Sequence, residues 1–261
     1  MPAISYVLAA AVLVLVLVSS FLRLLYILPA YNPTKPHPRP RGQPTRLLVI
    51  LGSGGHTSEM FSLLRDLDPN LYTHRSYIVS SGDSFSASKA VDFERALETK
   101  RRHEQGTAPV PSTYDISVIP RARRIHQPLW TTPVSSLRCL VACFTLLGPP
   151  RTKIPWRSDI NQHRTERLAP GTPPHTYPDL IIANGPATAV LVIAASLLLR
   201  FLKCRGTEGK MRTIYVESWA RVNSLSLSGR ILVACGMVDR MLVQWEDLSR
   251  KGLGDFIGAL I

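Results

Sequence analysis

The chain has 261 residues, a hydrophobic fraction of 45% and a formal net charge of +13. Its N-terminal segment and two polar, Pro-rich stretches near 98–112 and 149–178 are unsuited to packing, so the remainder has the size of one ordinary domain. The positive charge favours anionic partners such as phosphorylated ligands or an acidic membrane surface. The basic residues are scattered and lack interleaved aromatic residues or a groove-reading helix, which excludes nucleic acid as the expected partner.

The N-terminus predicts a membrane anchor. Residues 3–22 are almost wholly apolar, AISYVLAAAVLVLVLVSSFL, and about 20 residues at ~1.5 Å each span the ~30 Å hydrocarbon layer. A secretory signal is the alternative, but the run is long, has no small-residue cleavage site and is followed by Arg23. Basic residues follow the helix and none precedes it, which places the rest of the chain in the cytosol. We expect an uncleaved anchor over residues 1–28 and a semi-rigid Pro-rich linker over residues 29–45.

Short β-branched runs alternate with helical stretches along the rest of the chain. We expect strands at Leu47–Leu51, Tyr77–Ser80, Asp115–Ile119, Leu180–Ala183, Thr213–Val216 and Met241–Gln244. We expect helices at His56–Leu67, Ser84–Leu97, Thr132–Leu147, Ala187–Leu202 and Ser224–Ala234. This alternation predicts an α/β fold, a single Rossmann-like domain over residues 46–245 with a parallel sheet covered on both faces.

Two of these helices are apolar but too short to cross a membrane. The runs Val134–Leu147 and Ala187–Leu202 suit buried or half-buried helices better than membrane spans. For Val134–Leu147 a position on the bilayer surface stays open.

The sharpest motif is a glycine-rich turn between the first strand and the first helix, Gly52-Ser53-Gly54-Gly55-His56-Thr57. Glycines permit a tight turn, and a helix N-terminus presents free N–H groups to a phosphate or diphosphate. The motif lacks the Lys-Ser/Thr ending of a P-loop and the spacing of a dinucleotide fingerprint. A simple capped turn is the structural alternative, but an imidazole beside an anion site is well placed to act as a general base.

The loops after the later strands carry further polar residues, which matters because ligands of such sheets bind at the carboxyl ends of strands. Asp83 follows the second strand and is a candidate helix cap. Asn184-Gly185 follows the fourth strand, where a simple turn and a contact to a ligand hydroxyl are equally open. Glu217 and Arg221 follow the fifth strand, a carboxylate and a guanidinium that are hard to explain as core. Arg121–Arg124, after the third strand, suits phosphate groups or a solvated charge run.

The sequence predicts no metal site and no cofactor. The cysteines Cys139, Cys143, Cys204 and Cys235 lack C-x-x-C spacing and are expected to be reduced, packed residues. Asp66-Leu67-Asp68 has the D-x-D pattern of metal-dependent glycosyltransferases, but it falls at an expected helix end rather than at a strand end.

In their order, these motifs resemble the membrane-anchoring subunit of the bipartite UDP-N-acetylglucosamine transferase of asparagine-linked glycosylation. No single motif is decisive, but their common order is specific and covers most of the chain outside the two polar stretches. The matching segments are Gly52–Met60, Ser81–Asp83, Pro178–Leu180, Asn184–Pro186, Val216–Ser218, Ala220-Arg221, Leu225–Gly229, Asp239 and Val243–Trp245.

The resemblance implies the N-terminal half of a GT-B glycosyltransferase, similar to the bacterial enzyme that adds N-acetylglucosamine to lipid I. The half that binds UDP-N-acetylglucosamine is then a separate soluble catalytic subunit, and the chain alone is expected to be inactive. The implied reaction adds the second N-acetylglucosamine to N-acetylglucosaminyl-diphospho-dolichol at the cytosolic face of the endoplasmic reticulum, with the nuclear envelope as a second allowed location. Size agrees, because a complete GT-B enzyme needs two Rossmann-like domains and one fits here.

Roles for individual residues follow as a hypothesis. The catalytic candidates are His56, as general base, and Glu217. The expected contacts to the acceptor diphosphate and sugar are Gly52, Ser53, Gly54, Gly55, Thr57, Asp83, Asn184, Gly185 and Arg221. By the resemblance, the tail of residues 246–261 binds the soluble partner through Phe256, Ile257, Gly258, Leu260 and Ile261. Two alternatives are a non-catalytic membrane receptor for the soluble subunit and a self-sufficient lipid-modifying enzyme.

Overall fold

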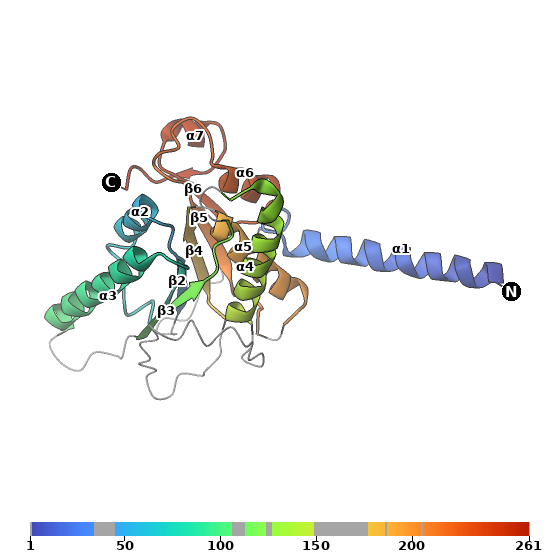
Figure 1. Cartoon of the computed structure of the whole chain (residues 1–261), viewed down its shortest axis with the longest axis horizontal. Helices are drawn as coiled ribbons and strands as arrows, with labels where there is room; N and C mark the ends of the chain where they lie inside the picture. The colour runs from blue at the N-terminus through green and yellow to red at the C-terminus, as the bar shows by residue number, and fades with distance from the viewer. Residues whose placement is uncertain are drawn as a thin grey trace.

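The computed structural model describes residues 2–33, 45–105, 113–123, 127–148, 177–185, 187–204 and 206–260. Most of the expected linker, the cores of both expected polar stretches, Arg124, Pro186 and Ile261 lie outside these residues. The described chain forms a single α/β head from which one long helix projects (Figure 1).

The head is built on a seven-stranded sheet of order β3-β2-β1-β4-β5-β6-β7, and every neighbouring pair is parallel. The strands are β1 (Arg46–Ile50), β2 (His74–Ser80), β3 (Thr113–Ile119), β4 (Leu180–Asn184), β5 (Arg212–Val216), β6 (Arg240–Val243) and β7 (Asp255–Phe256). This confirms the predicted Rossmann-like parallel sheet. The two-residue strand β7 was not predicted, because so short a segment carries no period of its own.

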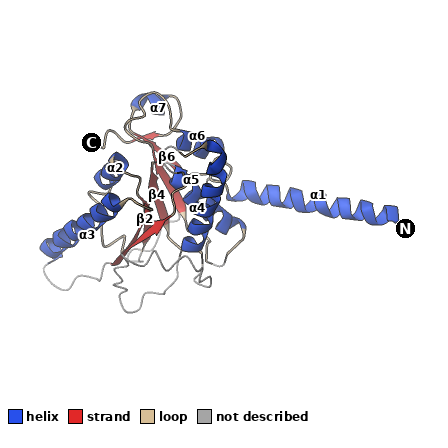
Figure 2. Cartoon of the chain, in the orientation of Figure 1, coloured by secondary structure: helices blue, strands red, loops and turns tan. Residues whose placement is uncertain are grey.

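Helices cover both faces of the sheet (Figure 2). On one side lie α2 (Gly55–Leu63) and α3 (Ser84–Gln105), and on the other lie α4 (Thr132–Leu147), α5 (Ala187–Phe201) and α6 (Leu227–Ala234). The 3-10 turn η1 (Leu129–Thr131) precedes α4, and the short α7 (Glu246–Arg250) follows β6. Strands covered on both faces bury continuous apolar runs, as β1 does with Leu47–Ile50.

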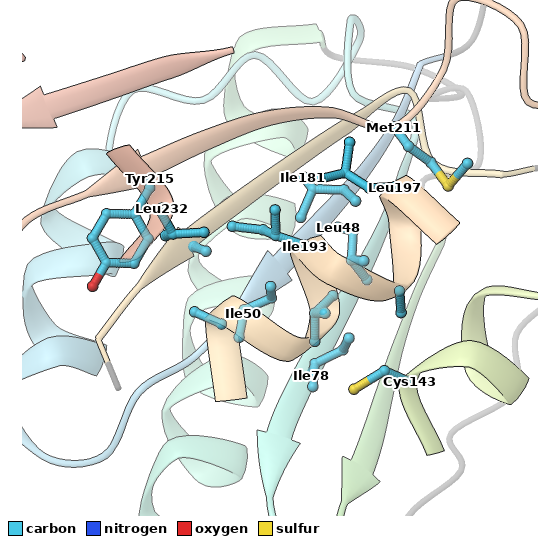
Figure 3. Close-up of a cluster of buried hydrophobic side chains, with 14 of the residues drawn as sticks. Leu48, Ile50, Ile78, Cys143, Ile181, Ile193, Leu197, Met211, Tyr215 and Leu232 are labelled. Carbon is cyan, nitrogen blue, oxygen red and sulfur yellow. The ribbon is translucent and has the colours of Figure 1, made fainter. Parts of the chain in front are cut away.

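Each face has its own core. The larger cluster joins the sheet to α4, α5 and α6, and Figure 3 shows its centre. It includes Leu48, Ile50, Ile78, Ile181, Ile193, Leu197, Tyr215 and Leu232. The opposite cluster packs α2 and α3 on the sheet through residues such as Met60, Leu64 and Ala90.

The cluster under α3 also contains a buried ion pair. The Arg75 guanidinium donates to both oxygens of Glu94, each at 2.6 Å, and the Tyr77 hydroxyl donates to Glu94 Oε1 at 2.7 Å. Arg75 and Glu94 are 1% and 4% exposed, so this bidentate pair fixes α3 to β2 away from water. Burial, together with the Glu94 carboxylate, raises the pKa of Tyr77 well above its usual range.

Several helix ends differ from those expected, including the end of α2 at Leu63 rather than Leu67. Helix α3 continues to Gln105 rather than ending at Leu97, so residues 98–105 are helical, and Arg101 among them is 3% exposed. Helix α6 begins at Leu227 rather than Ser224, because the Ser226 side chain accepts the Gly229 N–H and caps the helix there.

Helix α1 (Pro2–Ile27) is the projecting helix. Its segment Ser5–Ile27 has a mean hydropathy of 2.5 and is not buried against the rest of the described chain, and it is the one described helix long and apolar enough to cross a membrane.

The base of α1 is fixed to the head. Arg23 donates to the carbonyl oxygens of Arg200 at 2.8 Å and Phe201 at 3.4 Å, in the last turn of α5. Leu28 is 9% exposed and joins the larger core cluster. The Ala30 N–H donates to Gly236 O at 3.3 Å. The residues that follow α1 therefore pack on the head. The linker expected from residue 29 does not begin directly after the anchor.

Candidate functional site

The candidate site lies where the strand order reverses. Strands β1 and β4 are neighbours. From β1 the chain adds β2 and β3 on one side, and from β4 it adds β5, β6 and β7 on the other. Ligands of doubly wound sheets bind at such a switch point, outside the carboxyl ends of the strands. The glycine loop after β1 and the Asn184-Gly185 turn after β4 both lie there.

The glycine loop leaves the N-terminus of α2 open. Gly54 adopts φ 60° and ψ −122°, a conformation that a residue with a Cβ adopts only with strain, and no side chain caps the helix. Ser53, Gly54 and Gly55 are exposed. Free backbone N–H groups and the helix dipole therefore face solvent at this point, the arrangement that attracts a phosphate.

The imidazole of His56 is held between two glycines. A Cβ on Gly52 would lie 2.6 Å from His56 Cβ, and a Cβ on Gly185, whose φ is +99°, would lie 3.2 Å from His56 Cδ2. The ring therefore occupies space that any other residue at either position would fill. His56 is partly exposed, and its Nδ1 is buried without a hydrogen-bond partner among the described residues.

Thr57 and Asp83 hold the glycine loop in place. Both are buried, at 0% and 8% exposure, and their side chains bond within the loop, so a direct contact of either to the acceptor stays a prediction. The Thr57 hydroxyl donates to Gly52 O and lies 2.7 Å from Ser86 Oγ. The Asp83 carboxylate accepts the backbone N–H of Ser86 at 3.1 Å and lies 2.7 Å from its hydroxyl, so it caps α3 as the sequence predicts.

A carboxylate that was not predicted as a site residue lies at the centre of the polar network. Glu59, 8% exposed, accepts from Asn184 Nδ2 at 2.9 Å, Ser218 Oγ at 3.0 Å and Gln244 Nε2 at 3.1 Å. The Trp219 N–H lies 3.4 Å from the same carboxylate. Glu59 therefore connects α2 to the carboxyl ends of β4, β5 and β6.

Asn184 presents one unsatisfied atom in this network. Its side chain is 1% exposed, its Nδ2 is used by Glu59, and its Oδ1 has no hydrogen-bond partner among the described residues. Buried polar atoms are normally paired, and unpaired ones mark functional sites or places that a ligand or water fills.

Glu217 points beneath its own loop. Its carboxylate, 1% exposed overall, accepts the N–H of Ser218 at 3.0 Å and both the N–H and the hydroxyl of Ser226 at 2.9 and 3.0 Å. A Cβ on Gly229 would lie 2.3 Å from Glu217 Oε2, so the carboxylate fills the space at the start of α6. A direct catalytic contact of Glu217 stays a prediction, and this geometry supports a role in holding the loop of residues 218–226.

Tyr215 links the loop of residues 218–226 to the Asn184-Gly185 turn after β4. Its hydroxyl donates to Gly185 O at 2.8 Å and lies 3.4 Å from Ser226 Oγ. Burial, and then the nearby Glu217 carboxylate, raise the pKa of Tyr215 above its usual range, so the hydroxyl keeps its proton and acts as a donor. Arg221 lies on the exposed part of the same loop.

The C-terminal tail runs back over the carboxyl ends of the strands. After Phe256 in β7, the Ile257 N–H donates to Val243 O at 3.1 Å and the Leu260 N–H donates to Gln244 Oε1 at 3.0 Å. Ile257 and Leu260 pack on the cluster under α2, and Figure 1 shows the end of the chain near that helix. Gly258, with φ +80°, makes the bend between them. The described part of the predicted partner-binding segment thus lies against the end of β6 and the cluster under α2.

Several residues of this network were missed by sequence reasoning, namely Glu59, Ser86, Ser218, Ser226 and Gln244. Glu59 carried one signal that a closer reading finds. It lies one helical turn after His56 and next to Met60, in the first turns of a helix expected to pack on the sheet. A carboxylate buried there would need a hydrogen-bond partner.

The strand order and the open glycine loop at the switch point define the head as a Rossmann-like domain with an anion-binding type of turn. The family model described as "Oligosaccharide biosynthesis protein Alg14 like" matches residues 47–260. This chain belongs to that family.

Curated relatives agree over most of their length. The UDP-N-acetylglucosamine transferase subunit alg14 of Aspergillus fumigatus is 39% identical over 227 residues, covering 74% of this chain and 92% of the relative. The subunit of the same name from Yarrowia lipolytica is 36% identical over 243 residues, 93% of this chain and 91% of the relative. The human subunit is 33% identical over 205 residues, 78% of this chain and 77% of the relative.

Proposed function

We propose that this chain is the membrane-anchored subunit of a UDP-N-acetylglucosamine transferase and supplies the acceptor half of its active site. The reaction adds the second N-acetylglucosamine to N-acetylglucosaminyl-diphospho-dolichol, with a soluble catalytic subunit providing the donor half. The observation that carries the proposal is the open N-terminus of α2 at the switch point, with His56 beside it. Membership of a family whose curated relatives are named as transferase subunits supports it.

The glycine loop binds the acceptor diphosphate in this proposal. The exposed N–H groups at Ser53, Gly54 and Gly55 and the dipole of α2 supply the positive potential, and Arg221 adds a formal charge from the neighbouring loop. No metal is needed for this role, because backbone donors and an arginine neutralise the diphosphate.

His56 removes the proton from the acceptor hydroxyl as that oxygen attacks the anomeric carbon of the donor. Its buried Nδ1 is closed to solvent, so the proton goes to Nε2, the other ring nitrogen. In this proposal Asn184 Oδ1, which has no hydrogen-bond partner among the described residues, accepts a hydrogen bond from a hydroxyl of the acceptor sugar. Glu217 and Glu59 position these groups through the loop of residues 218–226 and through α2.

The location follows from α1 and from the charge bias around it. Helix α1 is long and apolar enough to span a bilayer, and the basic residues on its C-terminal side support a cytosolic position for the head. The proposed location is the membrane of the endoplasmic reticulum, where the tail of residues 246–261 recruits the soluble subunit.

The test is transfer activity in vesicles that contain the full chain, a diphospho-lipid acceptor bearing one N-acetylglucosamine, and the soluble catalytic subunit. We expect His56→Ala to reduce kcat by about 10²- to 10⁴-fold, the usual contribution of general acid–base catalysis. His103→Ala, on the exposed end of α3, is the matched control and should retain activity. Unchanged activity of His56→Ala would refute the general-base role of His56. If substitution of Gly54 also spared activity, a membrane receptor would be left as the function.

A further inference from the structure

Helix α4 carries an apolar stripe on the side that faces away from the head. Trp130, in η1, is 82% exposed, and Val134, Leu137 and Val141 are 57%, 61% and 44% exposed. Val134, Leu137 and Val141 follow one another at three- and four-residue spacing and so lie along one face of α4, and Trp130 precedes them in η1. We call these four residues the α4 stripe.

The stripe is additional to the packed face of α4. Cys139, Ala142, Cys143 and Leu147 are at most 8% exposed and belong to the larger core cluster. Helix α4 therefore has two apolar faces. One is packed in the core, and no described residue buries the other. Contiguous exposed apolar surface of this kind marks an interaction site.

Helix α3, on the opposite side of the sheet, shows what a water-facing helix looks like in this protein. Its exposed side carries ion pairs, Asp92 with Arg95 at 3.9 Å and Glu98 with Arg102 at 3.1 Å. Helix α4 contains no acidic residue, and its one charged side chain is the exposed Arg138. The two helix layers of the head thus differ in chemistry, and the α4 side is apolar and basic.

The position of α1 identifies what covers the stripe. Helix α1 is joined to the α4–α6 layer, since Arg23 binds the last turn of α5 and α5 packs on α4. Figure 1 shows α1 projecting from that side of the sheet, with the axis of α4 running across the direction of α1. A helix that lies across a membrane-spanning helix runs parallel to the membrane plane.

We infer that the α4 stripe inserts into the interfacial region of the bilayer and holds the head against the membrane. Apolar and aromatic residues beside basic side chains are typical of helices that lie in this region, where Trp is favoured and Arg pairs with anionic headgroups. Leu198 on α5 and Leu202 just after it, 42% and 60% exposed, add apolar side chains beside the last turn of α5, which Arg23 of α1 binds. This inference rests on the proposed membrane anchoring by α1.

The inference predicts contact between Trp130 and lipid acyl chains. The full chain is reconstituted in vesicles of phosphatidylcholine and phosphatidylserine, with or without brominated acyl chains, and tryptophan fluorescence is recorded. Bromine should quench a component of the emission that Trp130→Phe removes, so the difference between the two proteins isolates that residue. Leu137→Glu with Val141→Glu, at exposed positions that leave the core intact, should abolish the same component.

A matched control moves the probe to the other helix layer. Leu71, 48% exposed and located between α2 and β2, is replaced by Trp in the Trp130→Phe chain. That probe should respond to aqueous iodide and not to brominated lipid. Far-UV circular dichroism establishes that each variant retains the fold.

Each remaining outcome overturns the inference in a distinguishable way. Release of the chain by an alkaline carbonate wash would show that α1 does not anchor it, and both proposals would fail. A chain that stays bound while Trp130 responds only to iodide would overturn the role of the α4 stripe alone. Shielding of Trp130 from iodide only after addition of the soluble subunit would make the stripe a protein interface instead.

Discussion

Glu59 offers the sharpest test of how the candidate site is held together. Three side chains from different strand ends donate to its carboxylate, and the partners divide between its two oxygens. Oε2 accepts from Asn184 and Gln244, whose amide groups can only donate there, whereas Oε1 accepts from the Ser218 hydroxyl, which can also accept. This asymmetry predicts different consequences for two substitutions of similar size.

Glu59→Gln should be tolerated. The amide oxygen takes the place of Oε2, and the amide nitrogen donates to Ser218, so each hydrogen bond keeps a donor and an acceptor. The loss is the difference between charged and neutral hydrogen bonds, about 1–2 kcal/mol in the free energy of unfolding.

Glu59→Leu should be severe. It removes every acceptor and leaves the Asn184 amide and the Trp219 N–H unpaired, at about 1–3 kcal/mol each, whereas Gln244 keeps its bond to Glu217 O at 3.0 Å. The expected total is about 3–5 kcal/mol.

Urea unfolding of the purified chain, followed by circular dichroism, measures both values. The soluble-subunit assay should show a raised KM for the acceptor in the Leu variant, because α2 carries His56 one turn before Glu59. Equal losses of stability for Gln and Leu would refute the hydrogen-bond reasoning and assign the stability to the negative charge.

The remaining predictions concern other contacts of the head. Gly52→Ala places a Cβ 2.6 Å from His56 Cβ and should displace the imidazole ring. Transfer activity should then fall at least about tenfold while the chain still folds. Unchanged activity would show that the ring does not need the space beside Gly52. Glu94→Leu leaves the Arg75 guanidinium buried and should lower the free energy of unfolding by about 3–5 kcal/mol in urea titrations, with a loss below 1 kcal/mol counting against it. Gly236→Val would place a Cβ 2.5 Å from Ala30 Cβ and should release the base of α1 from the head. Limited proteolysis after residue 28 should then be faster than in the parent chain. Equal protection would contradict the contact between residue 30 and Gly236.

Local sequence patterns were sufficient to predict most helices and strands and the position of the glycine loop. The strand β4 and the helix α5 are recognisable because an apolar run changes period at Asn184-Gly185, and the bounds predicted for α4 are those observed. The glycine turn after β1 was predicted at the carboxyl edge of the sheet for the same reason. Such features depend on residues within a few positions of one another.

The tail shows where local patterns stop being sufficient. Strand β7 exists only because Asp255 and Phe256 meet Leu242 and Val243 of β6. The tail then reaches Gln244 through the N–H of Leu260, and nothing in its own sequence indicates that contact.

The sequence by itself determined the apolar α1, the alternation that makes a parallel sheet, and the glycine loop that opens α2. Only the tertiary structure decided that Glu59 is the centre of the site, because its partners Asn184, Ser218 and Gln244 lie 125, 159 and 185 positions away. It also turned Thr57 and Asp83 inward and left the α4 stripe uncovered. Hydrogen-bonding capacity is a property of a single residue, but its satisfaction depends on which strand ends the fold brings together.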